Sequence, residues 1–152
     1  MITIRPGGLD HPAVIELLAL HLAELRADTP LDNAHALDLD GLRRPGINFF
    51  AGWDGEELLG VAALRALSVD HGEVKSMRTV VAHRGKGVAR ALLSHLIATA
   101  SARGYRRLSL ETGTAPRFAA ANALYEATGF VDCDAFGGYP PSPHNRFMTL
   151  SL

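Results

Sequence analysis

One stretch in the middle of the chain restricts the fold more than any other. An apolar strand ends near Val81, a short basic turn rich in glycine follows, and residues 85–103 repeat apolar side chains at helical spacing. A second apolar strand begins at Arg107. A helix that crosses between two consecutive strands returns the chain in the same direction, so these two strands are expected to be parallel. The sequence therefore predicts a sheet with a parallel pair at its centre.

The remaining patterns surround this unit with short strands and three further helices. Strands are expected at residues 2–5, 48–53, 58–67, 73–81, 107–112, 131–133 and 147–150, and helices at residues 12–25, 34–42, 85–103 and 116–127. The order β-α-α-β-β-β-α-β-α-β-β predicts an α/β fold with a mixed, mostly antiparallel central sheet and helices on both faces. A chain of 152 residues is expected to form one domain, residues 1–152.

Composition argues against several classes of function. The formal net charge of −1 does not favour nucleic acid or an anionic membrane as a partner. No apolar run reaches the roughly 18 residues that a membrane-spanning helix requires. The single cysteine, Cys133, excludes an internal disulfide, and without a signal peptide this indicates a cytoplasmic protein. One cysteine and no His-x-x-x-His pair also argue against a zinc site, so no metal is expected.

The glycine-rich turn has the composition of an anion-binding site. Gly85 and Gly87 let the backbone approach a ligand closely, and Arg84 and Lys86 add positive charge. The first N–H groups of the following helix have no partner within the helix and lie at the positive end of its dipole. These features favour a phosphate or pyrophosphate. The alternative is an ordinary strand-to-helix turn with solvated basic residues.

Two common phosphate-binding patterns do not fit this turn. A P-loop requires Gly-Lys-Ser/Thr, which does not occur in the chain. The dinucleotide fingerprint requires Gly or Ala where this chain has Arg90. A nucleotide-binding protein is therefore disfavoured.

The pattern that does fit is Arg-x-x-Gly-x-Ala at residues 84–89, which resembles the acetyl-CoA pyrophosphate loop of the GNAT acetyltransferase superfamily. A second segment, Leu124-Tyr125-x-x-x-Gly129-Phe130, resembles that superfamily's Leu-Tyr-x-x-x-Gly-Phe segment. The predicted element order is also the GNAT order, so the resemblance covers nearly the whole chain. The segment 136–146, which begins Phe136-Gly137-Gly138-Tyr139-Pro140, resembles a Phe-Gly-x-Tyr-Pro-type loop in a branch of small bacterial single-domain GNAT proteins whose substrates are mostly unassigned.

This resemblance implies an N-acetyltransferase. Acetyl-CoA would be the co-substrate, and the acetyl group would pass directly to an amine of a small molecule or of a protein. A non-catalytic acyl-CoA sensor on the same fold is the alternative, since fold does not fix activity. A homodimer is left open. The resemblance assigns the pantetheine arm to backbone groups of Val80 and Val81, at a strand that splays from its neighbour, and the pyrophosphate to Arg84, Gly85, Lys86, Gly87, Val88 and Ala89.

The resemblance also assigns Tyr125 the role of protonating the departing thiolate. A phenol, with a pKa near about 10, remains a proton donor at neutral pH, whereas a thiol has a pKa near about 8.5. The alternative is an aromatic core residue with its hydroxyl at the rim. One position departs from the superfamily pattern: Phe118 stands where many members have an Asn that binds the pantetheine arm, and Asn122 lies on another side of that helix.

A base is also required, because an amine with a pKa near about 10.4 is protonated at pH 7. Glu73 is the first candidate and Glu111 the reserve. Strand alternation would place Glu73, Lys75, Met77 and Thr79 on one face, with polar residues on both faces of the strand. The alternative is a solvated Glu73–Lys75 pair.

Two segments are expected to form the acceptor site. One is 28–39, which includes His35. The other is 136–146, with Phe136 and Tyr139, which is too long and too rich in Pro and Gly for a simple hairpin and is interpreted as a lid; a plain surface loop is the alternative. Positive contacts from Lys75, His144 and Arg146 favour an amino-acid-like acceptor that carries a carboxylate. The substrate residues are thus Lys75, His35, Phe136 and Tyr139.

Overall fold

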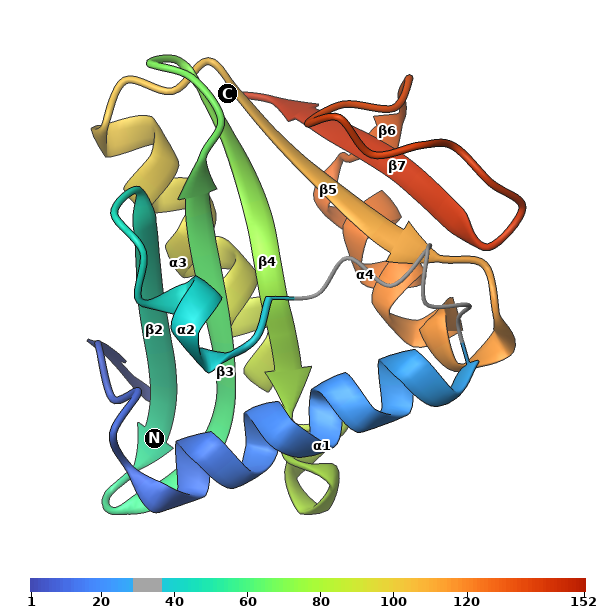
Figure 1. The fold of residues 1–152 in the computed structure, drawn as a ribbon. Helices are drawn as coiled ribbons and strands as arrows, with labels where there is room; N and C mark the ends of the chain where they lie inside the picture. The colour runs from blue at the N-terminus through green and yellow to red at the C-terminus, as the bar shows by residue number, and fades with distance from the viewer. Residues whose placement is uncertain (29–36) are drawn as a thin grey trace.

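A computed structural model describes residues 1–28 and 37–152. Within them one seven-stranded sheet has the order β1-β2-β3-β4-β5-β7-β6 (Figure 1). The strands are β1 (Thr3–Pro6), β2 (Ile47–Asp54), β3 (Glu57–Ala66), β4 (His71–Thr79), β5 (Arg107–Gly113), β6 (Val131–Asp132) and β7 (Asn145–Ser151). The helices are α1 (Pro12–Asp28), α2 (Leu39–Leu42), α3 (Val88–Ala102) and α4 (Ala119–Thr128), with short 3₁₀ turns η2 (Val81–His83) and η3 (Pro116–Phe118). Of these strand pairs, only β4 and β5 run parallel, so the predicted fold class is confirmed.

The helices cover both faces of the sheet. On one face, α1 and α2 bury Val14, Leu18 and Leu42 against β2 and β3. On the other, α3 and α4 pack against the sheet through a second cluster that includes Leu92, Leu96 and Tyr125 (Figure 1). In α3 the buried side chains at positions 88, 92, 96 and 100 recur every fourth residue, which is why this helix presents one continuous apolar stripe.

The central feature of the sheet is that β4 and β5 separate part of the way along. Their pairing begins at His71↔Arg107 and ends at Val74↔Leu110. Beyond that point β4 stays paired with β3, and β5 stays paired with β7. Figure 1 shows the two strands running side by side and then diverging. We call the divergent part, residues 75–79 of β4 and 111–113 of β5, the fork.

A β-bulge lies at the start of the fork. Ala63 of β3 faces Lys75 and Val61 faces Arg78, so the one residue between Ala63 and Val61 is opposite two residues of β4. One of the two, Ser76, has a φ of 55°. The extra residue moves Met77 into the cluster beneath α3, and Arg78 reaches α1 on the opposite face. The predicted alternation is therefore wrong beyond Lys75, because a bulge exchanges the two faces of a strand.

The boundaries of several predicted elements also shift. The strand expected at 73–81 runs from His71 to Thr79, because Val81 begins the η2 turn. The helix expected from Gly85 begins at Val88, since Gly85 and Gly87 have φ angles of 78° and 82°, which an α-helix does not allow. In the region expected to form a helix at 34–42, α2 accounts for the last four residues. The break at 29–33 and residues 34–36 lie outside the described residues.

Two facing glycines allow a test of how tightly β3 packs on α3. A Cβ on Gly60 would lie 2.8 Å from the Arg78 carbonyl and 3.0 Å from Val88, whereas a Cβ on the paired Gly52 would meet its nearest atom at 3.7 Å. We expect Gly60→Ala to lower the free energy of unfolding by about 1–3 kcal/mol, because the backbone or α3 must shift. Gly52→Ala, the matched control, should change it by less than about 0.5 kcal/mol. Urea unfolding of both variants measures the difference, and equal stabilities would contradict this packing.

Candidate active site

The fork opens into a pocket of about 150 Å³. Glu73 and Lys75 of β4, Glu111 of β5 and Tyr125 of α4 line it, and His21 of α1 lies at its edge. The pocket passes between the two strands because the sheet has no ladder there. The structure thus brings together in one pocket Glu73, Lys75, Tyr125 and the reserve base Glu111, all four of which the sequence analysis selected.

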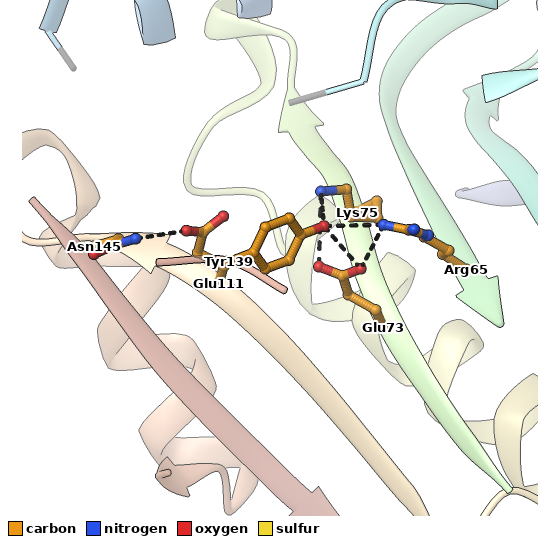
Figure 2. Close-up of polar contacts among 6 residues, drawn as sticks. All are labelled: Arg65, Glu73, Lys75, Glu111, Tyr139 and Asn145. Atoms are coloured by element: carbon orange, nitrogen blue, oxygen red, sulfur yellow. Dashed lines mark hydrogen bonds and ion pairs between the residues drawn. The ribbon is translucent and has the colours of Figure 1, made fainter. Parts of the chain in front are cut away.

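Glu73 is the centre of a buried polar network (Figure 2). Its side chain is fully buried, and its Oε1 accepts from the Tyr139 hydroxyl at 3.2 Å. That hydroxyl in turn accepts from Lys75 Nζ and from Arg65 Nη1, both at 3.0 Å. Glu73 Oε2 lies 3.7 Å from Lys75 Nζ and has no hydrogen-bond partner in the described part of the chain. One carboxylate oxygen is therefore held in place, and the other is left to accept a proton.

Burial and the neighbouring charges act on this network in opposite directions. Burial raises the pKa of the Glu73 carboxyl, while Lys75, the Tyr139 hydroxyl and Arg65 act to lower it. Burial also lowers the pKa of the Lys75 ammonium, against the attraction of Glu73 and Glu111. A carboxylate whose pKa is raised accepts a proton more readily than an ordinary glutamate does. The predicted alternative of a solvated Glu73–Lys75 pair is wrong, since the exposed fractions of the two side chains are 0% and 7%.

Glu111, the reserve base, lies across the fork from this network. It is the first residue of β5 beyond the last rung of the β4–β5 ladder, and its Oε2 accepts from Asn145 Nδ2 at 2.8 Å (Figure 2). Glu111 is half-buried, whereas Glu73 is fully buried. Both carboxylates therefore line the pocket, in different surroundings.

The position of Tyr125 is compatible with both interpretations of the sequence, an aromatic core residue and a proton donor at the pocket. Its ring belongs to the core cluster beneath α4 and packs edge-on against Phe130, with 5.9 Å between ring centres. It also lines the pocket. Burial raises the pKa of its hydroxyl to about 12, so the phenol keeps its proton at neutral pH. Tyr125 is thus a packed ring that lines the pocket with its hydroxyl protonated, which is the form a proton donor requires, although the raised pKa also makes it a weaker acid than an ordinary phenol.

The glycine-rich turn leads from the end of β4 into α3. The first intrahelical bond joins Ala91 N–H to the Gly87 carbonyl, so the N–H groups of Val88, Ala89 and Arg90 precede it and are directed toward the turn. A Cβ built on Gly85 or Gly87 meets no atom within 4 Å, so these glycines are required by their positive φ angles. These groups fit an anion.

Basic side chains accompany the turn. Lys86 Nζ donates to Nδ1 of His83, whose Nε2 donates to Glu57, both at 3.1 Å. Arg84 follows directly after η2, and its N–H donates to the Val81 carbonyl. The Lys86 ammonium is therefore held beside the turn by a local contact, and the exposed Arg84 side chain begins at the same turn.

The backbone expected to bind a pantetheine arm lies slightly earlier than predicted. Val80 N–H already donates to the Leu59 carbonyl at 2.8 Å, and the Val80 carbonyl accepts from His83 N–H. The expectation of free backbone at Val80 is thus wrong, because its N–H completes the pairing with β3. Residues 75–79 of β4 form no ladder with β5, so this stretch offers the open edge.

Phe118, which stands where many superfamily members have Asn, is a packing residue. The ring of Phe118 lies so close to Gly113 that a Cβ there would come within 2.2 Å of it. Asn122 accepts from Thr112 Oγ1 and donates to the Gly113 carbonyl, at 2.8 and 3.0 Å. Asn122 therefore holds α4 against the end of β5.

The segment between β6 and β7 is fixed by aromatic contacts. Phe136 packs against Tyr139 and Phe147, with ring centres 5.9 and 5.6 Å apart. Tyr139 reaches the network around Glu73, and His144 lines the pocket. Arg146 is different: it pairs with Asp132 and Glu126 on the surface, so its predicted contact with the acceptor is wrong.

Sequence reasoning missed several polar residues at this site, and one predicted residue is not described. Three separate elements supply these residues, which are Arg65, His21 and Arg78. The sequence pointed only toward Arg78, through the polar residues on both faces of its strand. His35 and most of segment 28–39 lie outside the described residues.

Two features are absent from the described part of the chain. Within residues 1–28 and 37–152 no helix is long and apolar enough to cross a bilayer. Those residues also contain no group of three or more His, Cys, Asp or Glu side chains that could hold a metal ion.

Comparison with known proteins places this geometry in context. Residues 13–130 match the sequence model of the Acetyltransferase (GNAT) family. The N-acetyltransferase YedL of Escherichia coli, itself uncharacterized, is 44% identical over 152 residues, covering all of this chain and 96% of its own. The uncharacterized N-acetyltransferase YsnE of Bacillus subtilis is 46% identical over 149 residues, covering 98% of this chain and 99% of its own.

Solved structures agree with the fold. A GNAT family acetyltransferase from Elizabethkingia anophelis, crystallised with acetyl-CoA bound, superposes with a TM-score of 0.70 at 17% identity. The match covers 99% of this chain and 98% of that one. At that identity the likeness shows the fold alone.

The Tyr139 hydroxyl provides a direct test of the Glu73 network. Tyr139→Phe removes a donor to the ionised carboxylate, so the pKa of Glu73 should rise further. Carboxyl ¹³C NMR titration of the purified variant and of the wild type measures this shift. Tyr125→Phe is the matched control, because it alters a ring at the same pocket and should leave the Glu73 pKa near its wild-type value. A Tyr139→Phe titration that overlays the wild type would contradict the network.

Proposed function

The chain belongs to the GNAT acetyltransferase family, and from this membership and the geometry of the fork we propose that it transfers the acetyl group of acetyl-CoA to an amine of a small molecule. Acyl transfer follows from the family, while the donor, the acceptor and the residue roles are our proposal. The supporting observation is that one pocket contains Glu73 and Tyr125, and that the strand which carries Glu73 leads through η2 into the glycine-rich turn.

Starting from the acceptor ammonium, the proposed reaction removes two protons from nitrogen and supplies one to sulfur. Glu73 Oε2 takes a proton from the acceptor ammonium, directly or through water, and the free amine attacks the acetyl carbonyl carbon. The new C–N bond forms as the C–S bond breaks, and the electron pair leaves with sulfur. The Tyr125 hydroxyl protonates the thiolate, the second proton of the attacking nitrogen restores that hydroxyl directly or through water, and Glu73 releases its proton to solvent. Glu111 remains the alternative base because it lines the same pocket.

The proposed donor site uses backbone more than side chains. The N–H groups at the start of α3, between Gly87 and Arg90, would receive the pyrophosphate, with Arg84 and Lys86 adding charge. The open edge of β4 at residues 75–79 would pair with the amides of the pantetheine arm as a peptide adds to a sheet edge.

The proposal is tested by thiol release. Purified protein is incubated with acetyl-CoA and a panel of small amines, and free CoA is measured together with the acetylated product by mass spectrometry. Amine-dependent release of CoA supports an enzyme. CoA binding without release for any amine would indicate an acyl-CoA sensor and contradict the proposal.

The turn at the start of α3 yields a binding prediction. We expect CoA to bind in the micromolar range, about −8 kcal/mol, and Gly87→Glu to abolish binding by repelling phosphate and straining a φ of 82°. Gly104→Glu is the matched control, because Gly104 also has a positive φ, of 80°, and follows the other end of α3. Calorimetry should show wild-type CoA affinity for Gly104→Glu. If a folded Gly87→Glu protein binds CoA as tightly, the turn is not the pyrophosphate site.

The base assignment predicts a pH dependence. Since burial raises the pKa of Glu73, the wild-type kcat/KM should rise with pH above the range of an ordinary glutamate, as the carboxyl becomes ionised. Glu73→Gln should remove this limb and lower kcat/KM by about 10²–10⁴-fold at neutral pH, with a smaller loss where the amine is already free. Glu111→Gln should keep the limb. The reverse pattern would assign the base to Glu111, and a uniform loss at all pH values would indicate a structural role for Glu73.

The acid assignment predicts separate effects on chemistry and binding. Tyr125→Phe keeps the packed ring and removes the proton, so kcat should fall about 100-fold with little change in CoA affinity. Activity assays at saturating substrates measure kcat, and calorimetry on the same preparation measures the CoA affinity. A wild-type kcat at saturating substrates would rule out the acid role.

A further inference from the structure

The guanidinium of Arg78 has a buried edge that contacts no hydrogen-bond acceptor among the described residues. Its Nη1 donates to Glu24 of α1 at 2.5 Å, and the side chain is 9% exposed. Its Nε and Nη2 atoms are buried and have no hydrogen-bond partner among the described residues. Buried donors on a charged group are normally paired, because leaving them unpaired is unfavourable.

The two unpaired nitrogen atoms lie along one edge of the planar guanidinium. Nε–H and Nη2–H point in nearly the same direction, and this edge matches the two oxygens of a carboxylate. Glu24 fixes the other side of the group, and its Oε2 also accepts from Arg117 at 3.4 Å. The ion pair thereby holds Arg78 in one orientation without occupying the edge.

Two further unpaired polar atoms belong to this region. Nδ1 of His21 and Oγ of Ser76 are buried and without a partner among the described residues, and both residues line the pocket. His21 precedes Glu24 by three residues on α1, so the two side chains lie on one face of the helix. Ser76 lies in the bulge two residues before Arg78.

The protonation state of the His21 imidazole allows it to donate a hydrogen bond. Burial, and then the charge of Arg78, lower the pKa of its imidazole to about 4, so the ring is neutral at physiological pH and carries one N–H. A neutral imidazole, a hydroxyl and a guanidinium edge can all donate hydrogen bonds. A ligand that satisfies them together must offer acceptor oxygens.

The other cations near the pocket already have contacts with protein groups. Lys75 and Arg65 donate to the Tyr139 hydroxyl beside Glu73. Arg146 is paired with Asp132 on the surface. A carboxylate on the acceptor would therefore find its bidentate partner at Arg78.

We propose that Arg78, His21 and Ser76 form a carboxylate subsite at the α1 end of the pocket, where His21 and Ser76 line the pocket wall and Arg78 lies behind them, two residues beyond Ser76 on β4. Resting on the proposed function, this subsite makes the acceptor a molecule with both an amine and a carboxylate. It transfers the acid-binding role that the sequence suggested for Lys75 and Arg146 to a residue held by α1. Arg78 is then a specificity-determining residue.

The test uses product-like probes that cannot react. Protein with ¹⁵N-labelled arginine and saturating CoA is titrated with a panel of N-acetyl amino acids and with the matching N-acetyl amino amides. The Arg78 Nε–H signal, assigned by its loss in Arg78→Lys, is followed by NMR. At least one acid should shift this signal while its amide does not. If no acid shifts it, or if acid and amide shift it equally, the subsite is refuted.

Variants separate ligand binding from support of the fold. Arg78→Lys keeps the charge and loses the bidentate edge, so affinity for the acid should fall about 10- to 100-fold with CoA affinity unchanged. Glu24→Gln is the control, because it weakens the ion pair and keeps the edge; it should retain acid affinity within about threefold. Equal losses in both variants would show that Arg78 acts only through Glu24. If Arg78→Lys does not fold, calorimetry of the acid and its amide on the wild type and on Ser76→Ala decides: the acid should bind the wild type more tightly than the amide and should lose affinity in Ser76→Ala, and equal affinities of acid and amide would refute the subsite.

The outcomes distinguish this subsite from the proposed reaction. Release of CoA with an amine that lacks a carboxylate, at the rate seen for the corresponding acid, supports acetyl transfer and overturns the subsite. An acid that shifts the Arg78 signal in a protein that releases no CoA with any amine supports the subsite and overturns the transfer reaction.

Discussion

The separation of β4 from β5 after the Val74–Leu110 pair is the constraint on which the rest of the site depends. A continuous ladder would fill this position with backbone hydrogen bonds and leave no room for a ligand. Because the two strands diverge, one edge of each is open, and the side chains at the divergence point face a pocket. The bulge at Ser76 strengthens this effect, since it turns Arg78 toward α1 and Met77 toward α3. The fork therefore provides an open backbone edge, with the charged Arg78 on the α1 face of the sheet and the apolar Met77 on the α3 face.

Buried charge at the fork is better explained by function than by stability. Burying Glu73 and Lys75 removes both from water, and the attraction within such a pair often does no more than offset that loss. Apolar residues of similar size would stabilise the sheet at least as well. What the charged residues add is a carboxylate with one oxygen fixed by Tyr139 and Arg65 and with a raised pKa. Such a group is poorly suited to holding a fold together and well suited to exchanging a proton.

The parts of this structure that follow local patterns could be predicted from sequence. The glycine-rich turn, the helix after it and the parallel strands on either side follow from periodicity and turn chemistry, and they determine the fold class. The GNAT-like segments led to the family. The sequence also selects Glu73, Lys75 and Tyr125, which the fold brings together in one pocket, while their roles are predictions.

The remaining features depend on which residues face each other across the sheet. The bulge at Ser76 is a matter of hydrogen-bond register, which alternation of residue types does not encode. The partner of Tyr139 could not be predicted because 66 residues separate it from Glu73. Arg146 was assigned to the wrong surface, since a positive residue near a loop gives no sign of the acids that neutralise it. Arg78 was visible only as one polar residue in a strand, and its unpaired edge is a property of the folded state.

The contact between Tyr139 and Glu73 has a consequence for how proteins of this shape can diversify. Tyr139 belongs to the segment between β6 and β7, which also contributes His144 to the pocket wall. One exchangeable surface segment therefore shapes the chamber and sets the basicity of a residue on a distant strand. Grafting this segment from another protein would alter selectivity and reactivity together. A graft that keeps the tyrosine should tolerate wide variation elsewhere, whereas one that loses it would need a new donor before it could work at the same acidity.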